Sequence, residues 1–197
     1  GSGYEYRAIT NPSALNNITE PFGKNENLVG AINDGNDKTG SMVTAFINAY
    51  YSITKVPVVG VSASEGGTLI SQWQPNGAKL DDAINRLSNA VSYLTTNGFS
   101  IRHKYMVWCQ GESDGDSNRS AEDYTNMFNA MFNAMKSQGI EKCFLVRIGK
   151  YNGSGASDYS TIINAQTEIC KNNYDVIMAS TALASFKDDG LMKDAFH

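Results

Sequence analysis

Apolar positions after residue 40 alternate between helical and strand-like patterns. The first helical spacing is set by Met42, Phe46, Ile47 and Tyr50. The run 56–61 that follows is short and continuously apolar, as in a buried strand, with Pro57 near its start. A longer amphipathic pattern over 80–94 ends near Asn97-Gly98, which is typical of a helix C-terminus. The sequence therefore predicts a helix, a strand and a second helix in this region.

The same alternation continues to the end of the chain. Strand-like runs occupy 104–110, 143–149 and 174–180, and helical patterns occupy 120–139 and 158–172. In the first of these helices Ser120 is a candidate N-cap and Gly139 a candidate stop. Its apolar stripe predicts core positions at Tyr124, Met127, Phe128, Met131, Phe132 and Met135. Residues 1–40, rich in Asn and Gly, are predicted mostly as loop.

Four helix–strand units with nearly continuous apolar strands indicate one α/β domain over residues 1–197. Such strands are buried on both faces, so we expect a three-layer α/β/α sandwich with a mostly parallel sheet. Right-handed crossovers bring the carboxyl ends of all strands to one edge, where ligand sites form. The polar segments expected to meet at that edge are 62–70, 110–119, 149–157 and 181–197.

The composition of the chain argues against nucleic acid, a membrane or a metal ion as a partner. The net charge of −4 and the lack of a basic stripe argue against nucleic acid. No apolar run approaches the roughly 20 residues of a membrane span, so no membrane partner is expected. The three cysteines, Cys109, Cys143 and Cys170, are far apart and are predicted as buried free thiols. With two histidines and no H-E-x-x-H, neither a catalytic zinc site nor another cofactor is expected.

A literal G-x-S-x-G occurs at residues 111–115, centred on Ser113. In a nucleophile elbow the serine lies on a strained turn and a helix begins directly after it. The helical pattern here begins only at Ser120, after the polar segment 114–119. We therefore interpret the match as accidental. The alternative, an α/β-hydrolase that uses Ser113 with His197 as base, stays open at this point.

Three sequence blocks carry a family resemblance. They are Gly66-Gly67-Thr68 followed by Trp73, the segment WCQGESD at 108–114, and Asp194-Ala195-Phe196-His197. In this order and at strand ends, they resemble the SGNH (GDSL-like) hydrolases, in the branch of sialate O-acetylesterases and acetylxylan esterases. The resemblance implies a flavodoxin-like three-layer fold and a serine esterase that removes acetyl groups from an acetylated carbohydrate.

One expected block is missing. The nucleophilic serine of the family belongs to a block resembling G-Q-S-N after the first strand, and residues 1–197 contain none. Family members also continue into a closing helix after the D-x-x-H block. The resemblance thus implies an internal portion of a longer hydrolase, with the nucleophile supplied by a complementary segment. The rival interpretation is a catalytically inactive carbohydrate-binding or scaffold module derived from such an enzyme.

The resemblance and the chemistry of ester hydrolysis assign roles to the remaining residues. His197, with an ordinary pKa near 6.5, is the expected general base, and Asp194 is expected to hold its Nδ1. The Gln110 amide and a backbone N–H of Gly66 or Gly67 are expected to form the oxyanion hole. Glu112 is expected to brace the loop or to orient His197, and Asp114 is expected to be structural or solvated. Trp73 is a candidate for stacking on the sugar, and His103 is expected on the surface.

Overall fold

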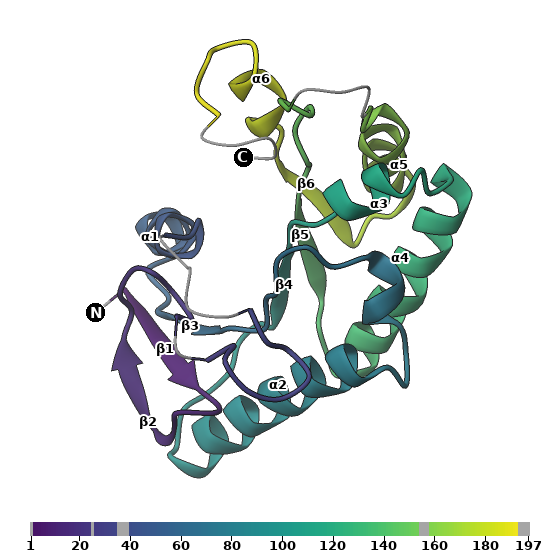
Figure 1. Ribbon diagram of the computed structural model, residues 1–197. Coiled ribbons are helices and arrows are strands. Elements are labelled where there is room, and N and C mark those ends of the chain that lie inside the picture. The colour runs from purple at the N-terminus through teal and green to yellow at the C-terminus, as the bar shows by residue number, and fades with distance from the viewer. Residues whose placement is uncertain (1, 25, 35–39, 154–157, 193–197) are drawn as a thin grey trace. The chain divides into compact units, whose positions relative to one another are not determined.

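The computed structural model describes residues 2–24, 26–34, 40–153 and 158–192 (Figure 1). It divides into two compact units. Unit 1 comprises residues 1–66 and 78–101, and unit 2 comprises residues 67–77 and 102–197. Each unit contains a three-stranded sheet of its own. Within the described ranges, none of the helices has both the length and the apolar character that a membrane crossing requires.

The sheet of unit 1 has the order β2-β1-β3. β1 (Gly3–Arg7) runs antiparallel to β2 (Asn11–Asn17) and parallel to β3 (Val58–Val61). The prediction of loop for residues 1–40 is therefore wrong over both β1 and β2. Asn and Pro have low strand propensity, and here pairing with neighbouring strands overrides it. β2 lies at the sheet edge, where the missing N–H of Pro12 is tolerated.

Two helices pack on opposite faces of this sheet. Ile47 of α1 (Val43–Thr54) lies against Gly3, whereas Tyr93 of α2 (Ala78–Thr96) lies 5.3 Å from Tyr6, ring centroid to centroid. Gly3 and Tyr6 are three residues apart on one strand, so they face opposite ways. Both predicted helices and the strand between them are confirmed.

A buried arginine organises the interior of unit 1. Arg86 of α2 donates to both carboxylate oxygens of Asp82, at 3.0 Å each. Its Nη1 also donates to the side chain of Asn27 at 2.6 Å and to the backbone carbonyls of Glu26 and Ser62. Because a buried charge needs partners, this network explains how an arginine is accommodated here. The hydrogen bonds of Arg86 connect residues 26–27 to Ser62, which directly follows β3.

Unit 2 contains the regular α/β part of the chain. β4 (Tyr105–Trp108), β5 (Lys142–Val146) and β6 (Val176–Ser180) are parallel, in the order β4-β5-β6. The crossovers are α4 (Ala121–Ser137) and α5 (Ser160–Asn172). All five predicted elements are present. β3, expected in the same series, pairs instead with β1, a strand that the sequence pattern did not reveal.

The ends of α4 follow the predicted rules. The Ser120 hydroxyl accepts from the backbone N–H of Asp123 at 3.0 Å, and Gly139 follows the helix with φ +84°. The buried stripe of α4 is Tyr124, Phe128, Met131, Phe132 and Met135, whereas Met127, also predicted as a core position, is only half-buried. α4 and α5 are the crossovers between consecutive parallel strands, and they pack against each other on one face of the sheet (Figure 1).

Three short helical segments complete unit 2: η1 (Ile70–Trp73), α3 (Glu112–Asp116) and α6 (Leu183–Phe186). Two of them directly follow strands, since α3 comes after β4 and α6 after β6. They therefore lie at the carboxyl edge of the parallel sheet, where α/β proteins place their ligand sites.

Candidate active site

The turn after β4 is built around a glycine. Gly111 has φ +150° and ψ −14°, and α3 begins at the next residue. A Cβ at this position would lie 2.9 Å from Ile162 Cγ2 and 3.0 Å from Gln166 Nε2. Both the positive φ and the close approach of α5 therefore require glycine here.

The short helix α3 corrects one sequence inference. The helical pattern was expected to begin only at Ser120, yet α3 begins at Glu112, so a strand–turn–helix does follow β4. Its five residues are too few for an apolar periodicity to show. Ser113 nevertheless lies within the helix, with helical backbone, and the residue with positive φ is Gly111. Ser113 is thus not at the strained position that an elbow nucleophile occupies.

Asp114 is the buried anchor of this turn. Its side chain is 0% exposed, and its carboxylate accepts from the backbone N–H of Ile70 at 2.8 Å and from Gln110 Nε2 at 2.6 Å. Arg119 pairs with the other carboxylate oxygen and compensates the charge. Of the two roles expected for Asp114, the structural one is therefore correct. The carboxylate fixes the 110–119 segment to the start of η1.

The Gln110 side chain is held by two acceptors. Its Nε2 donates to the backbone carbonyl of Thr68 at 2.8 Å as well as to Asp114. The backbone carbonyl of Gln110 in turn accepts from Tyr124 Oη at 2.9 Å and from Gln166 Nε2 at 2.7 Å. Its role as an oxyanion donor stays a prediction. In that role the amide would exchange one of its two acceptors for the oxyanion.

Two residues of this network were not identified from sequence as part of the site. Tyr124 was predicted only as a core position of α4, and Gln166 carried no signal beyond its place in a helix. Burial raises the pKa of Tyr124, which keeps its hydroxyl protonated and able to donate. Gln166 also accepts from the backbone N–H of Ile148 at 3.0 Å, which joins the β4 and β5 turns.

The two glycines expected in the oxyanion hole, Gly66 and Gly67, belong to different units. Gly67 has φ +68° and belongs to unit 2, next to Thr68, which contacts Gln110. Gly66 belongs to unit 1, where its backbone N–H donates to Asp34 Oδ1 at 2.6 Å. The structure thus brings the Gly67-Thr68 segment and Gln110 together. The oxyanion role of either glycine stays a prediction.

Trp73 lies in the interior of unit 2. It is 3% exposed, its Nε1 donates to Thr68 Oγ1 at 3.0 Å, and its ring meets Trp108 edge-on at 5.7 Å. In this position Trp73 holds the Thr68 side chain through a hydrogen bond. The predicted stacking of Trp73 on a sugar is not tested by these contacts. Trp108 is buried, as its place in the strand predicted.

Glu112 lies in the first turn of α3, half-buried, where a carboxylate is favourable. Together with burial, which is the larger cause, its charge raises the pKa of the Cys109 thiol to about 12. Its bracing or orienting role stays a prediction. His103 is exposed, as expected for a surface residue, and its Nδ1 lies 2.9 Å from Glu141 Oε2.

The thiols give a pH-dependent prediction. All three cysteines are free, as predicted, but only Cys143 is fully buried, whereas Cys109 and Cys170 are half-buried. Burial raises the pKa of Cys170 to about 11 and that of Cys143 still further. The raised pKa values keep these thiols protonated at pH 8. They are therefore expected to react slowly, because the thiolate is the reactive form. We expect Ellman's reagent to react about 100-fold more slowly with the native protein than with the protein in urea, where thiols have a pKa of about 8.5. A thiol that reacts at the unfolded rate in the native protein would contradict this.

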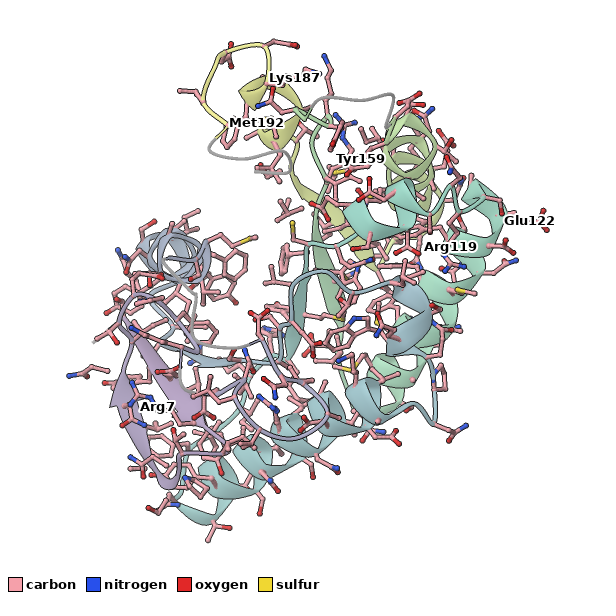
Figure 2. The ribbon with its side chains drawn as sticks, in the orientation of Figure 1. Arg7, Arg119, Glu122, Tyr159, Lys187 and Met192 are labelled. Atoms are coloured by element: carbon pink, nitrogen blue, oxygen red, sulfur yellow. The ribbon has the colours of Figure 1, made fainter. Side chains whose placement is uncertain are left out.

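Three turns meet at the carboxyl edge of the unit 2 sheet. Tyr159 Oη donates to Asp116 Oδ1 at 2.9 Å, which joins α5 to α3. Lys187 Nζ donates to the backbone carbonyl of Tyr151 at 2.7 Å, which joins α6 to the β5 turn. Figure 2 shows Tyr159 beside α3 and Lys187 at the end of α6. Of the expected segments 62–70, 110–119, 149–157 and 181–197, the described parts of the last three meet at this edge. Residues 67–70 join them through Thr68 and Ile70, whereas residues 62–66 belong to unit 1.

Gly115 is required for the contact between α3 and Tyr159. A Cβ on Gly115 would lie 2.3 Å from Tyr159 Cδ1. We expect Gly115→Ala to lower the free energy of unfolding by about 1–3 kcal/mol, because the ring must move from its place beside Asp116. Urea unfolding measures this. Gly40→Ala, where no atom lies within 4 Å of the new Cβ, is the control and is expected to change stability by less than about 0.5 kcal/mol.

The predicted catalytic pair lies outside the described residues. Asp194 and His197 follow Met192, which is the last described residue and comes after α6 (Figure 2). Residues 154–157, part of the predicted rim, also lie outside the described ranges. The predictions for Asp194 and His197 therefore stay predictions.

The fold places this protein in the class of α/β proteins, in which ligand sites form at the carboxyl ends of parallel strands. A family model described as "carbohydrate esterase, sialic acid-specific acetylesterase" matches residues 16–197. The chain belongs to this family, and the resemblance inferred from the three sequence blocks is confirmed.

A solved structure shows a similar fold. It is the X-ray structure of a protein from Arabidopsis thaliana, with a TM-score of 0.68 and 20% sequence identity, and the match covers 91% of this chain and 68% of that one. The expected α/β class, with a mostly parallel sheet and three layers, is thereby confirmed. A comparison with curated proteins gives no match.

Proposed function

We propose that the protein is a carbohydrate O-acetylesterase that uses Ser-His-Asp chemistry, with the serine supplied by a segment outside residues 1–197. The family match over residues 16–197 carries the proposal. The buried network around Gln110 supports it, because it fixes a polar turn at the edge of the sheet where such sites form.

In the proposed mechanism His197 takes the proton of the serine hydroxyl and later gives it to the leaving alcohol of the sugar. Asp194 accepts from Nδ1 and keeps Nε2 directed at the serine. His197 is the fifth residue after Met192, so the covalent chain keeps it within about 18 Å of that residue. This reach is compatible with a position at the rim that α6 helps to form.

The carbonyl oxygen of the acetyl group gains negative charge in the tetrahedral intermediate and needs hydrogen-bond donors. We assign one donor to the backbone N–H of Gly67, because Gly67 precedes Thr68, which is already bonded to Gln110. Gly66 is the weaker candidate, since its N–H donates to Asp34. Gln110 supplies a second donor if its amide exchanges an acceptor, and otherwise holds Thr68 in place.

The direct test is acetate release from O-acetylated sugars by the protein that includes the nucleophile-bearing segment. O-acetylated sialic acid and acetylated xylo-oligosaccharides are the two substrates to compare. We expect hydrolysis of at least one, with saturation kinetics. Binding of both without acetate release would contradict the proposal and support the non-catalytic module instead.

A further inference from the structure

Two buried side chains, one from α4 and one from α5, donate to the backbone carbonyl of Gln110. Tyr124 Oη lies 2.9 Å from the carbonyl oxygen, and Gln166 Nε2 lies 2.7 Å from it. Gln166 Nε2 also donates to Tyr124 Oη at 3.0 Å, so the two side chains hold each other in place. Both side chains are 0% exposed, so these bonds form away from solvent, where the loss of one is costly.

The same tyrosine lies next to the side-chain amide of Gln110. Its Oη is 3.4 Å from Gln110 Oε1, whereas Gln110 Nε2 donates to the Thr68 carbonyl and to the Asp114 carboxylate. A hydroxyl can donate or accept, but a carbonyl and an ionised carboxylate only accept. If the amide were turned over, Oε1 would face two acceptors. The surroundings of Gln110 therefore favour one orientation of its amide.

Gln166 extends this network to the next strand. Its Oε1 accepts from the backbone N–H of Ile148 at 3.0 Å, and Ile148 follows β5 by two residues. Its Nε2 donates to the turn after β4, and a Cβ on Gly111 would lie only 3.0 Å from this nitrogen. Gln166 thus joins the carboxyl ends of two neighbouring parallel strands from behind the turn.

The position of Gln110 matters in either of the roles considered for it. As an oxyanion donor, its amide must point at the charge that develops in the transition state. As a support for Thr68, it must keep the neighbouring N–H of Gly67 in place. A displacement of about 1 Å can lower the rate of a reaction about 100-fold, so both roles depend on the groups that hold Gln110.

We propose that Tyr124 and Gln166 are positioning residues for acetyl ester hydrolysis, which act through Gln110 on the segment that binds the oxyanion. This inference rests on the proposed esterase function and adds two residues that influence its rate without contacting the substrate. Because the oxyanion forms only as the reaction proceeds, their loss is expected to change kcat and to have little effect on KM.

The test measures kcat and KM of Tyr124→Phe in the protein that includes the nucleophile-bearing segment, with 4-nitrophenyl acetate and an O-acetylated methyl glycoside as substrates. We expect kcat to fall about tenfold on both esters and KM to change by less than about twofold. Gln166→Met, which keeps the length of the side chain and removes its donors, is expected to have the same effect.

Tyr159→Phe is the matched control. Tyr159 is also buried in unit 2, and its hydroxyl donates at the same distance of 2.9 Å, but to Asp116 and not to Gln110. We expect this variant to retain kcat within about twofold, since the hydrogen bond that it loses does not hold Gln110. An unchanged kcat in Tyr124→Phe, or an equal loss in Tyr159→Phe, would overturn the inference.

A double-mutant cycle with Gln110→Ala distinguishes positioning from a general loss of stability. If Tyr124 acts through Gln110, adding Tyr124→Phe to Gln110→Ala lowers kcat by less than about twofold further. Two independent effects would multiply instead, and that result would also overturn the inference.

Urea unfolding of the same variants separates this inference from the proposed function. If the unsubstituted protein hydrolyses neither ester, the proposed function fails, and the cycle is measured through the unfolding midpoint. A smaller shift from Tyr124→Phe in the Gln110→Ala protein than in the unsubstituted protein supports the placement of Gln110 by Tyr124. Equal shifts would overturn it.

Discussion

Replacing His197 with alanine is expected to lower kcat/KM for acetyl ester hydrolysis by about 10⁴-fold or more, because the serine then lacks its general base. The measurement uses the protein that includes the nucleophile-bearing segment, with 4-nitrophenyl acetate as substrate.

Ser113→Ala is the matched control for this prediction. Ser113 lies within α3 with a helical backbone, two residues after the glycine that makes the turn. We expect its loss to change kcat/KM by less than about threefold, as is usual for a side chain outside the reacting groups. An equal loss of activity in His197→Ala and Ser113→Ala would restore the α/β-hydrolase alternative.

Asp114→Ala is expected to have the largest effect on stability, lowering the free energy of unfolding by about 3–5 kcal/mol. The substitution removes the acceptor for the Ile70 N–H, the Gln110 amide and Arg119, and it leaves buried donors without partners. Urea unfolding, followed by tryptophan fluorescence, is a suitable measurement because Trp73 and Trp108 both lie in unit 2.

The control for Asp114 is Asp188→Ala. Asp188 forms an ion pair with Lys150 in which both side chains are more than half exposed, so its loss is expected to cost less than about 1 kcal/mol. If Asp114→Ala is no more destabilising than Asp188→Ala, the buried carboxylate is not the anchor of the Gln110 turn. Asp114→Asn adds a useful comparison, since it keeps the shape of the side chain and removes the charge.

Periodicity predicted the elements whose local signals agree with their packing. α4 begins where Ser120 offers an N-cap and ends before a glycine with positive φ, and its buried stripe follows the helical spacing of its aromatic and methionine residues. The strands of unit 2 were located from their apolar runs, although burial on both faces holds only in part, because Val107 of β4 and Ile177 of β6 are each 39% exposed. In α4, the capping residues, the apolar pattern and the packing in the folded protein all favour the same helix.

Elements without such agreement could not be predicted. β2 contains Pro12 and three Asn residues, and only its pairing with β1 makes it a strand. α3 has five residues, and it is held by the long-range bond from the Ile70 N–H to Asp114 and by the ion pair of Asp114 with Arg119. A pattern within one segment carries no information on a partner 44 residues away, such as Ile70 for Asp114.

The same limit applies to the site. Gln110 and Gly67 were located from their motifs, and the structure brings their segments together through Thr68. The hydroxyl of Tyr124 and the amide of Gln166, which fix the backbone of the turn, come from helices whose patterns show only that they face the core. Their roles depend on the tertiary structure and are therefore seen only in it.

The central claim is that a serine outside residues 1–197 forms the acyl-enzyme and that His197 activates it. Labelling the protein that includes the nucleophile-bearing segment with a fluorophosphonate, followed by peptide mass spectrometry, tests this most directly. The account predicts one labelled serine in that segment and loss of labelling in His197→Ala. A label on Ser113, or on any other residue within 1–197, would contradict it.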